Sequence, residues 1–441
     1  MKYSNNLKNL AEELVQYATR KGASECQVSI TEGTEFSVEL REGKIERLVE
    51  AGSKSLAFKV IVDNKVATAS SSDFTTETLN GLIENAIKRA KLSSADPFSG
   101  LPELEPININ VESLDLYDNQ VVEMAAEDKI KFARELEEIC LKDKRIKLSA
   151  GSAFFSNIGE YILANSKGFI GSYKGTSCGA GVQLQAGSDD NPYEDGWWDS
   201  CIHLKDLLSV EEIAKIAVHR TTRMIGAKKI ATQNVPVVLE PTMTSRILGF
   251  LSGCVSGAAI YLNQSFLTGK INTKIADEKV NIIDNGLIPR MPGSRPFDAE
   301  GVPTRITPII ESGMLVNYLL DTYSARKLDM KSNGHAGSPT NFYLMPGNYA
   351  PEDIIKSVDK GLFLTNTIGQ GTVPTTGDIS TGAYGLWIEN GEIAYPVSEI
   401  TISGNLGKIL SEIEMIGNDI DYKRQITGPT IKIKELTISG L

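Results

Sequence analysis

Apolar residues recur along the first 92 residues with two different periods, which predict where helices and strands alternate. From about residue 5 to residue 20, leucine and valine side chains fall three or four positions apart on one face, and Gly22 supplies a stop. Apolar and polar residues alternate within residues 26–40 and again within 56–69, which is the period of a half-buried strand. A second helical pattern covers about residues 75–91. This stretch therefore predicts the order helix, strands, helix.

The same order of elements repeats after a connector. Residues 93–118 contain three prolines and several acids, which indicates an extended surface segment. A helical pattern covers about residues 120–141, and strand patterns cover roughly residues 147–186. A further helix begins at Ser209, where Glu212 completes a capping box. We therefore expect a duplicated α-β-β-α unit built around an antiparallel sheet.

A change in composition near residues 229–234 predicts a second domain. Beyond it, Asn-Gly or Ser-Gly pairs stand between alternating apolar residues, which is a strong hairpin signal because type I′ turns need positive φ at both central residues. The pattern occurs at residues 283–288, 310–315 and 388–393. Pro289 weakens the first of these, since proline interrupts a strand. We expect an α+β domain over residues 1–228, with a subdivision near 93–118, and a mostly antiparallel β domain over 229–441.

The composition excludes several classes of protein. The net charge of −11, without a lysine- and arginine-rich stripe, disfavours a nucleic-acid partner. No apolar run reaches the roughly 20 residues that a membrane helix needs, and the first residues show no signal-peptide pattern. The five cysteines are scattered and form no Cys-x-x-Cys pair, so neither a disulfide framework nor a structural zinc site is indicated. We expect a cytoplasmic protein without nucleic-acid or membrane partners.

The chain has only three histidines, and their spacing excludes a helical zinc site. His203, His219 and His335 are all too far apart for the four- or five-residue spacing that places two imidazoles on one helix face. His335 lies in a glycine-rich loop of the kind that approaches ligands closely, so it is the histidine to test first. The favoured interpretation of His335 is nevertheless a loop residue without a functional role.

Two further constellations carry candidate chemistry. Ser177 stands in a Gly-x-Ser-x-Gly motif, but the following residues alternate like a strand, whereas a nucleophile elbow needs a helix there. Asp298 and Glu300 are two residues apart, so in an extended strand both carboxylates point the same way. Such a pair can act as acid and base, hold a cation or cap backbone amides. Because the sequence shows no nucleophile or metal ligand beside this pair, salt bridges and capping of backbone amides are the favoured roles for it.

A helix expected from about residue 242 to 259 contains glycine at every fourth position. Gly249, Gly253 and Gly257 each cost about 1 kcal/mol of helix propensity, so something should offset them. Close approach by a neighbouring element is the simplest offset, and a face turned toward substrate is the alternative.

Several short motifs are spread over nearly the whole chain. No single one identifies a family, but their combination does. The longest runs from Phe297 to Thr304, with the sequence Phe-Asp-Ala-Glu-Gly-Val-Pro-Thr, and continues at residues 323–328. Shorter motifs lie at residues 38–46, 71–74, 382–391, 395–397, 399–406, 416–419 and 436–440. Together they resemble the PmbA (TldE) branch of the TldD/PmbA metallopeptidase family, some members of which are described as modulators of DNA gyrase.

The resemblance implies a role beside a zinc peptidase. In the TldD branch, the helix before the long motif carries a His-Glu-x-x-x-His zinc site. Here the corresponding positions hold Gly249, Phe250 and Cys254, so no metal-ligand role carries over. We therefore expect that a TldD-like partner binds the zinc, and that this chain binds no cofactor and helps to enclose unfolded peptides for cleavage or maturation.

The expected substrate-binding or cavity residues come from the glycine-rich helix and from the polar segments after it. They are Gly249, Gly253, Cys254, Asp298, Glu300 and His335. No catalytic or metal-binding residue is assigned to this chain. Two alternatives stay open: a stand-alone homo-oligomer, such as a homodimer, that binds peptides, and an independent hydrolase that uses Ser177 or His335.

Overall fold

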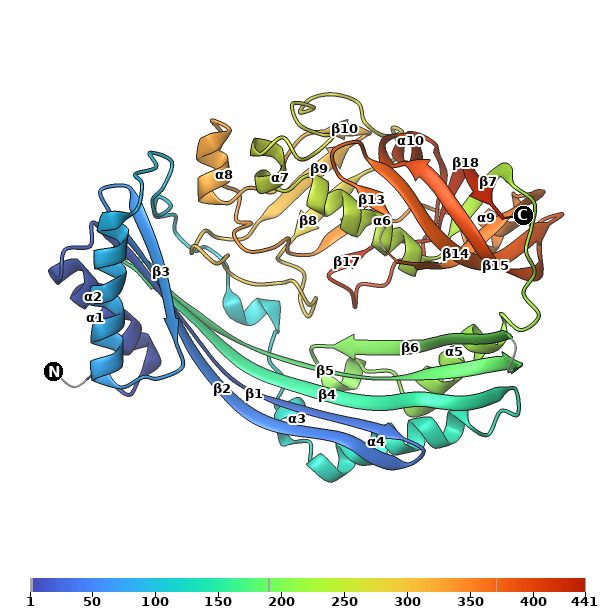
Figure 1. Ribbon diagram of the computed structural model, residues 1–441, viewed down its shortest axis with the longest axis horizontal. Coiled ribbons are helices and arrows are strands. Elements are labelled where there is room, and N and C mark those ends of the chain that lie inside the picture. Colours follow the sequence, from blue (N-terminus) through green and yellow to red (C-terminus); the bar gives the residue numbers. More distant parts are fainter. Residues whose placement is uncertain (1–2, 189–190, 370, 441) are drawn as a thin grey trace.

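A long curved sheet lies opposite a β-rich C-terminal lobe in the computed structural model, which describes residues 3–188, 191–369 and 371–440 (Figure 1). The N-terminal lobe is one six-stranded sheet with the order β3-β2-β1-β4-β5-β6, antiparallel throughout. Its strands are β1 (Glu25–Arg41), β2 (Lys44–Val62), β3 (Lys65–Ser71), β4 (Ile146–Asn165), β5 (Ile170–Ser188) and β6 (Asn191–Cys201). Its helices are α1 (Leu7–Arg20), α2 (Thr76–Leu92), α3 (Asn119–Glu123), α4 (Ala126–Cys140) and α5 (Val210–Thr222).

The apolar alternation along β1 sets which face of this sheet the helices cover. Buried side chains occupy even positions near both ends of the strand, from Cys26 to Ile30 and from Phe36 to Leu40, so they point to one face, whereas Glu32 and Thr34 between them are exposed. One end of that face packs against α1 and α2, and the other end packs against α4 and α5. The opposite, concave face carries the odd positions and is turned toward the C-terminal lobe (Figure 1).

The duplication is visible in the strand order. The two halves meet where β1 pairs with β4, and each half continues outward through two more strands. Each unit is therefore α-β-β-β-α rather than the expected α-β-β-α. The strand missing from the prediction is β6, whose Asn, Pro, Asp and Gly residues have low strand propensity. The capping box of α5 is confirmed, whereas the single helix expected over 120–141 is two helices, α3 and α4.

The C-terminal lobe contains two sheets and short helices, which confirms the α+β expectation. One sheet has the order β10-β9-β8-β11-β17, and the other runs β12-β7-β18-β15-β14-β13, with β16 paired to β18. The strands are β7 (Gln233–Leu239), β8 (Ile282–Asn285), β9 (Ile306–Glu311), β10 (Met314–Leu315), β11 (Phe342–Leu344), β12 (Lys360–Ile368), β13 (Thr372–Val373), β14 (Asp378–Glu389), β15 (Glu392–Asn405), β16 (Ile413–Ile416), β17 (Ile426–Thr427) and β18 (Ile431–Ser439). The helices are α6 (Pro241–Cys254), α7 (Gly257–Tyr261), α8 (Thr322–Lys327), α9 (Pro351–Lys356) and α10 (Leu406–Ser411).

Two of the three expected hairpins are present. Ser312-Gly313 joins β9 to β10, and Asn390-Gly391 joins β14 to β15. The central residues have φ of 47° and 80° in the first turn and 52° and 76° in the second, as a type I′ turn requires. The segment at 283–288 is not a hairpin, because β8 pairs instead with β9 and β11.

Aromatic and ionic contacts hold the two lobes together. Phe297 packs edge-on against Phe169 and Tyr173 of the N-terminal lobe. At the other contact, Arg220 of α5 forms a buried ion pair with Glu240, the residue that precedes α6, with an N–O distance of 2.7 Å. No helix among the described residues is long and apolar enough to cross a membrane.

Candidate functional site

One face of α6 lines a cavity of about 330 Å³. Met243, Arg246, Ile247 and Phe250 are spaced three and four residues apart, which places them on the same side of the helix. The rest of the wall comes from the C-terminal sheet and from the chain after β12: Leu364, Thr367, Gly369, Gly371, Thr372, Ile379, Thr381 and Ile402. Figure 1 places α6 on the side of the C-terminal lobe that faces the concave sheet.

The glycines of this helix have different surroundings. A Cβ atom added at Gly249 or Gly253 would meet no atom within 4 Å, so no neighbouring element packs against either residue. At Gly257 the added atom would overlap the side chain of Ser324, so close packing explains that glycine alone. The helix also ends at Cys254, and α7 begins at Gly257. The exposed part of α6 therefore has an open surface that packing does not explain.

Gly249, Phe250 and Cys254, which the resemblance aligns with the zinc motif of the TldD branch, do not fit a zinc ion. Gly249 offers no donor, and the Phe250 side chain lines the apolar cavity. Cys254 is fully buried in the core of the C-terminal lobe, where burial raises the pKa of its thiol to about 11. Residues 3–188, 191–369 and 371–440 contain no group of three or more His, Cys, Asp or Glu side chains arranged to hold a metal. No metal-dependent step can be assigned to these residues.

Asp298 and Glu300 are buried and serve different partners. The segment is a tight turn with Gly301 at φ 86°, so the extended geometry expected for the pair is absent. Asp298 accepts hydrogen bonds from the backbone amides of Glu300, Val302 and Ala336, at 2.9 to 3.0 Å. Burial raises the pKa of Asp298 to about 6, against the lowering effect of these amides. The pair therefore caps backbone groups and does not line the α6 cavity.

Glu300 links the lobes. Its carboxylate accepts a hydrogen bond from the Thr322 amide at 2.9 Å and lies 3.4 Å from the ammonium group of Lys59 on β2. It stands at the N-terminus of α8, where a negative charge is favoured.

His335 is a structural residue in the interior of the C-terminal lobe. Its Nε2 lies 2.8 Å from Asp284 Oδ1, and its Nδ1 lies 2.8 Å from Asn333 Oδ1. Both the histidine and the aspartate side chains are at most 2% exposed. The histidine therefore holds the glycine-rich loop to β8 and is not among the residues that line the α6 cavity.

Ser177 does not have the setting of a nucleophile. It lies within β5, and its hydroxyl accepts a hydrogen bond from the Asn157 side chain at 3.3 Å. No histidine lines the cavity beside it among the described residues. The strand continues on both sides, so the elbow geometry is absent.

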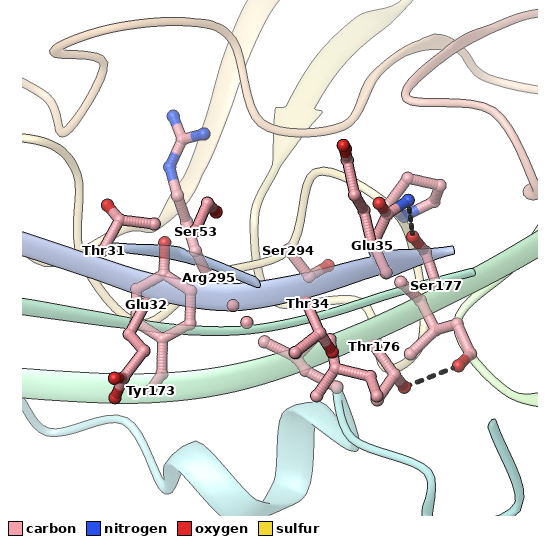
Figure 2. Close-up of a pocket in the computed structure, with 18 of the residues that line it drawn as sticks. Thr31, Glu32, Thr34, Glu35, Ser53, Tyr173, Thr176, Ser177, Ser294 and Arg295 are labelled. Carbon is pink, nitrogen blue, oxygen red and sulfur yellow. Dashed lines mark hydrogen bonds between the residues drawn. The ribbon is translucent and has the colours of Figure 1, made fainter. Parts of the chain in front are cut away.

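A second cavity, of about 520 Å³, lies between the N-terminal sheet and residues 292–295 of the C-terminal lobe. Figure 2 shows small polar side chains, among them Thr31, Ser53 and Ser177, together with Glu35 and Arg295 around it. The sequence prediction missed this cavity. The available signal was the polar run at residues 31–35 in the middle of β1, which interrupts the alternation of buried positions, but nothing in the sequence indicates that residues 292–295 lie across it.

Comparison with known proteins places this geometry in one family. The family model of the PmbA/TldA metallopeptidase domain 1 matches residues 26–90, the central-domain model matches 120–225, and the C-terminal-domain model matches 232–440. The chain is 31% identical to Metalloprotease PmbA of Escherichia coli O157:H7 over 98% of this chain and 97% of that protein. It is 30% identical to the Metalloprotease PmbA homolog of Haemophilus influenzae, over 97% of this chain and 94% of that protein.

Solved structures show the same fold. A candidate modulator of DNA gyrase from Bacteroides thetaiotaomicron has a TM-score of 0.93 and 27% identity, covering 99% of this chain and all of the other. TldE from Thermococcus kodakarensis has a TM-score of 0.84 and 22% identity, covering 97% of this chain and 99% of the other.

Proposed function

The chain belongs to the PmbA/TldA metallopeptidase family, and we propose that it acts there as the subunit that binds peptide while a TldD-like partner supplies the metal chemistry. The observation that carries the proposal is the exposed face of α6. Gly249 and Gly253 face open space and Phe250 faces a cavity, whereas Cys254 points into the core. In this proposal, the helix presents a surface without metal ligands at the positions where the resemblance places the zinc site of the TldD branch.

The occurrence of both branches in one organism supports a two-subunit enzyme. Relatives of this chain in Buchnera aphidicola from Acyrthosiphon pisum include a Metalloprotease PmbA homolog, 32% identical over 94% of this chain, and a Metalloprotease TldD homolog, 29% identical over 53%. We propose a corresponding division of labour for this chain, in the cytoplasm, where five buried free cysteines are stable.

The two cavities are suited to different parts of an unfolded peptide. The α6 cavity is walled by apolar side chains, which favours apolar side chains of the substrate. The cavity over the concave sheet is lined by hydroxyl and amide side chains and glycines, together with charged and apolar residues, and its polar groups can form hydrogen bonds to an extended backbone. In this proposal the chain contributes to substrate affinity and not to bond cleavage.

A bulky side chain on the open face of α6 tests the proposal. We expect Gly253→Trp to raise the KM of the complex with a TldD-like subunit for an unfolded peptide about ten-fold or more, with kcat and bound zinc unchanged. Gly81→Trp is the matched control, because Gly81 is also a helical glycine with open space around it, on α2. An unchanged KM in Gly253→Trp, or an equal rise in both variants, argues against a substrate role for this face.

A further inference from the structure

The α6 cavity combines an apolar wall with a cation. Six of its lining side chains are apolar, and Met243, Leu364, Ile379 and Ile402 are each at most 6% exposed. A volume of about 330 Å³ is at the lower end of the range for ligand pockets and is suited to one large side chain rather than to a folded segment.

Arg246 is the only cationic residue among the described residues that line this cavity. Its guanidinium donates to the carbonyl oxygens of Thr367 at 2.9 Å and Gly369 at 3.4 Å. These acceptors are neutral, and a guanidinium has five N–H groups, so three remain for another acceptor. Within the part of the chain that the structure describes, Arg246 forms no ion pair, whereas Arg220 and Arg223 nearby are both paired with Glu240.

No acidic side chain is among the described residues that line the cavity, so nothing there repels an anion. A ligand that complements an unpaired guanidinium beside an apolar wall has a carboxylate a few bonds from an apolar group. In an unfolded peptide, an internal backbone segment offers neutral amides, and an acidic side chain carries its carboxylate on only one or two methylene groups, without a large apolar group. The C-terminal residue offers both features when its side chain is apolar.

We propose that the α6 cavity binds the C-terminal residue of a peptide, with its apolar side chain inside the cavity and its carboxylate on Arg246. This inference rests on the proposed function and names the part of the substrate that this subunit recognises. The hydrogen bonds to Thr367 and Gly369 hold the guanidinium at the β12 end of the cavity, so part of its ordering is complete before peptide binds.

Fluorescence anisotropy with the full chain tests the inference. The probe is a labelled, unstructured ten-residue peptide that ends in leucine, compared with its C-terminal amide and with the same peptide ending in serine. We expect the free acid with leucine to bind about ten-fold or more tightly than either of the others. We expect Arg246→Gln to abolish the difference between acid and amide, and Phe250→Ala to reduce the difference between leucine and serine.

The matched control is Arg134→Gln on α4, which removes an exposed arginine of the N-terminal lobe and should change neither difference. The comparison of acid with amide uses the unaltered protein, so it holds even if a variant folds poorly. Equal binding of acid and amide overturns the inference and leaves the proposed function intact, since peptide still binds. Tighter binding of a saturated fatty acid than of the peptide also overturns it, while failure to bind any of the peptides contradicts the proposed function itself.

Discussion

Replacing His335 should destabilise the C-terminal lobe without affecting peptide binding. Asn333 Oδ1 also accepts the Leu320 amide, and its Nδ2 donates to the Tyr318 carbonyl, so the amide orientation is fixed and His335 Nδ1 must be the donor. Asp284 accepts the backbone amide of Thr340, as an ionised carboxylate does. Because both oxygens of Asp284 already accept hydrogen bonds from Thr340, the carboxylate is the acceptor and His335 Nε2 is the donor. The pair is therefore a buried, hydrogen-bonded ion pair.

The size of the effect follows from what His335→Ala leaves behind. Asp284 is 0% exposed and would lose its imidazole partner, and breaking a buried pair by removing one partner costs about 3–5 kcal/mol. In amide hydrogen exchange, this corresponds to a fall in protection of roughly 100- to 4,000-fold for sites that open with the C-terminal lobe. The sites to follow are two backbone amides near His335. The Thr340 amide donates to Asp284, and the Ala336 amide donates to Asp298.

The assay is hydrogen–deuterium exchange with mass spectrometry, paired with peptide affinity measured at low temperature. His219→Ala is the control, because His219 is exposed on α5 and its loss should cost less than about 0.5 kcal/mol. Protection in His335→Ala within a factor of three of the unaltered chain would refute the ion-pair argument. A large loss of peptide affinity in a folded His335→Ala protein would instead restore the hypothesis that this histidine belongs to a binding site.

Three further predictions follow from α6 and from the turn at Asp298. Gly249→Ala should stabilise the protein by about 0.5–1 kcal/mol in urea unfolding, because its Cβ meets open space, whereas Gly257→Ala should destabilise it. The triple variant Gly249→His, Phe250→Glu, Cys254→His should bind no stoichiometric zinc by metal analysis, because position 254 points into the core; tight zinc binding would contradict that geometry. Asp298 has a pKa of about 6 in the folded chain and about 3.9 when unfolded, so its contribution to stability is present below pH 4 and is lost as the pH rises through 6. The stability advantage of the unaltered chain over Asp298→Asn in urea unfolding should therefore be larger at pH 4 than at pH 7, and an advantage that grows with pH would count against the buried, raised-pKa description.

Local patterns were sufficient where each residue's environment is set by its near neighbours. The period of two along β1 predicted both the strand and its buried face, and the Asn390-Gly391 pair predicted a hairpin, because positive φ at both positions is a local requirement. The capping box at Ser209 was predictable for the same reason.

Non-local geometry could not be predicted in this way. The spacing of Asp298 and Glu300 suggested a shared direction, but Gly301 turns the chain between them and the next residues. The glycine row looked uniform in sequence, yet only Gly257 meets another element. Neither cavity leaves a periodic signal in the sequence, because each is formed by segments more than 100 residues apart. β12 and β14 lie opposite Phe250 in one, and residues 292–295 lie opposite the N-terminal sheet in the other.

The most direct measurement of the central claim is the fate of an unfolded peptide incubated with this chain alone, with zinc and with or without a chelator. We predict that the peptide is bound and recovered intact by mass spectrometry under both conditions, and that a TldD-like subunit must be added before chelator-sensitive cleavage begins. Chelator-sensitive cleavage by the purified chain alone would contradict the account.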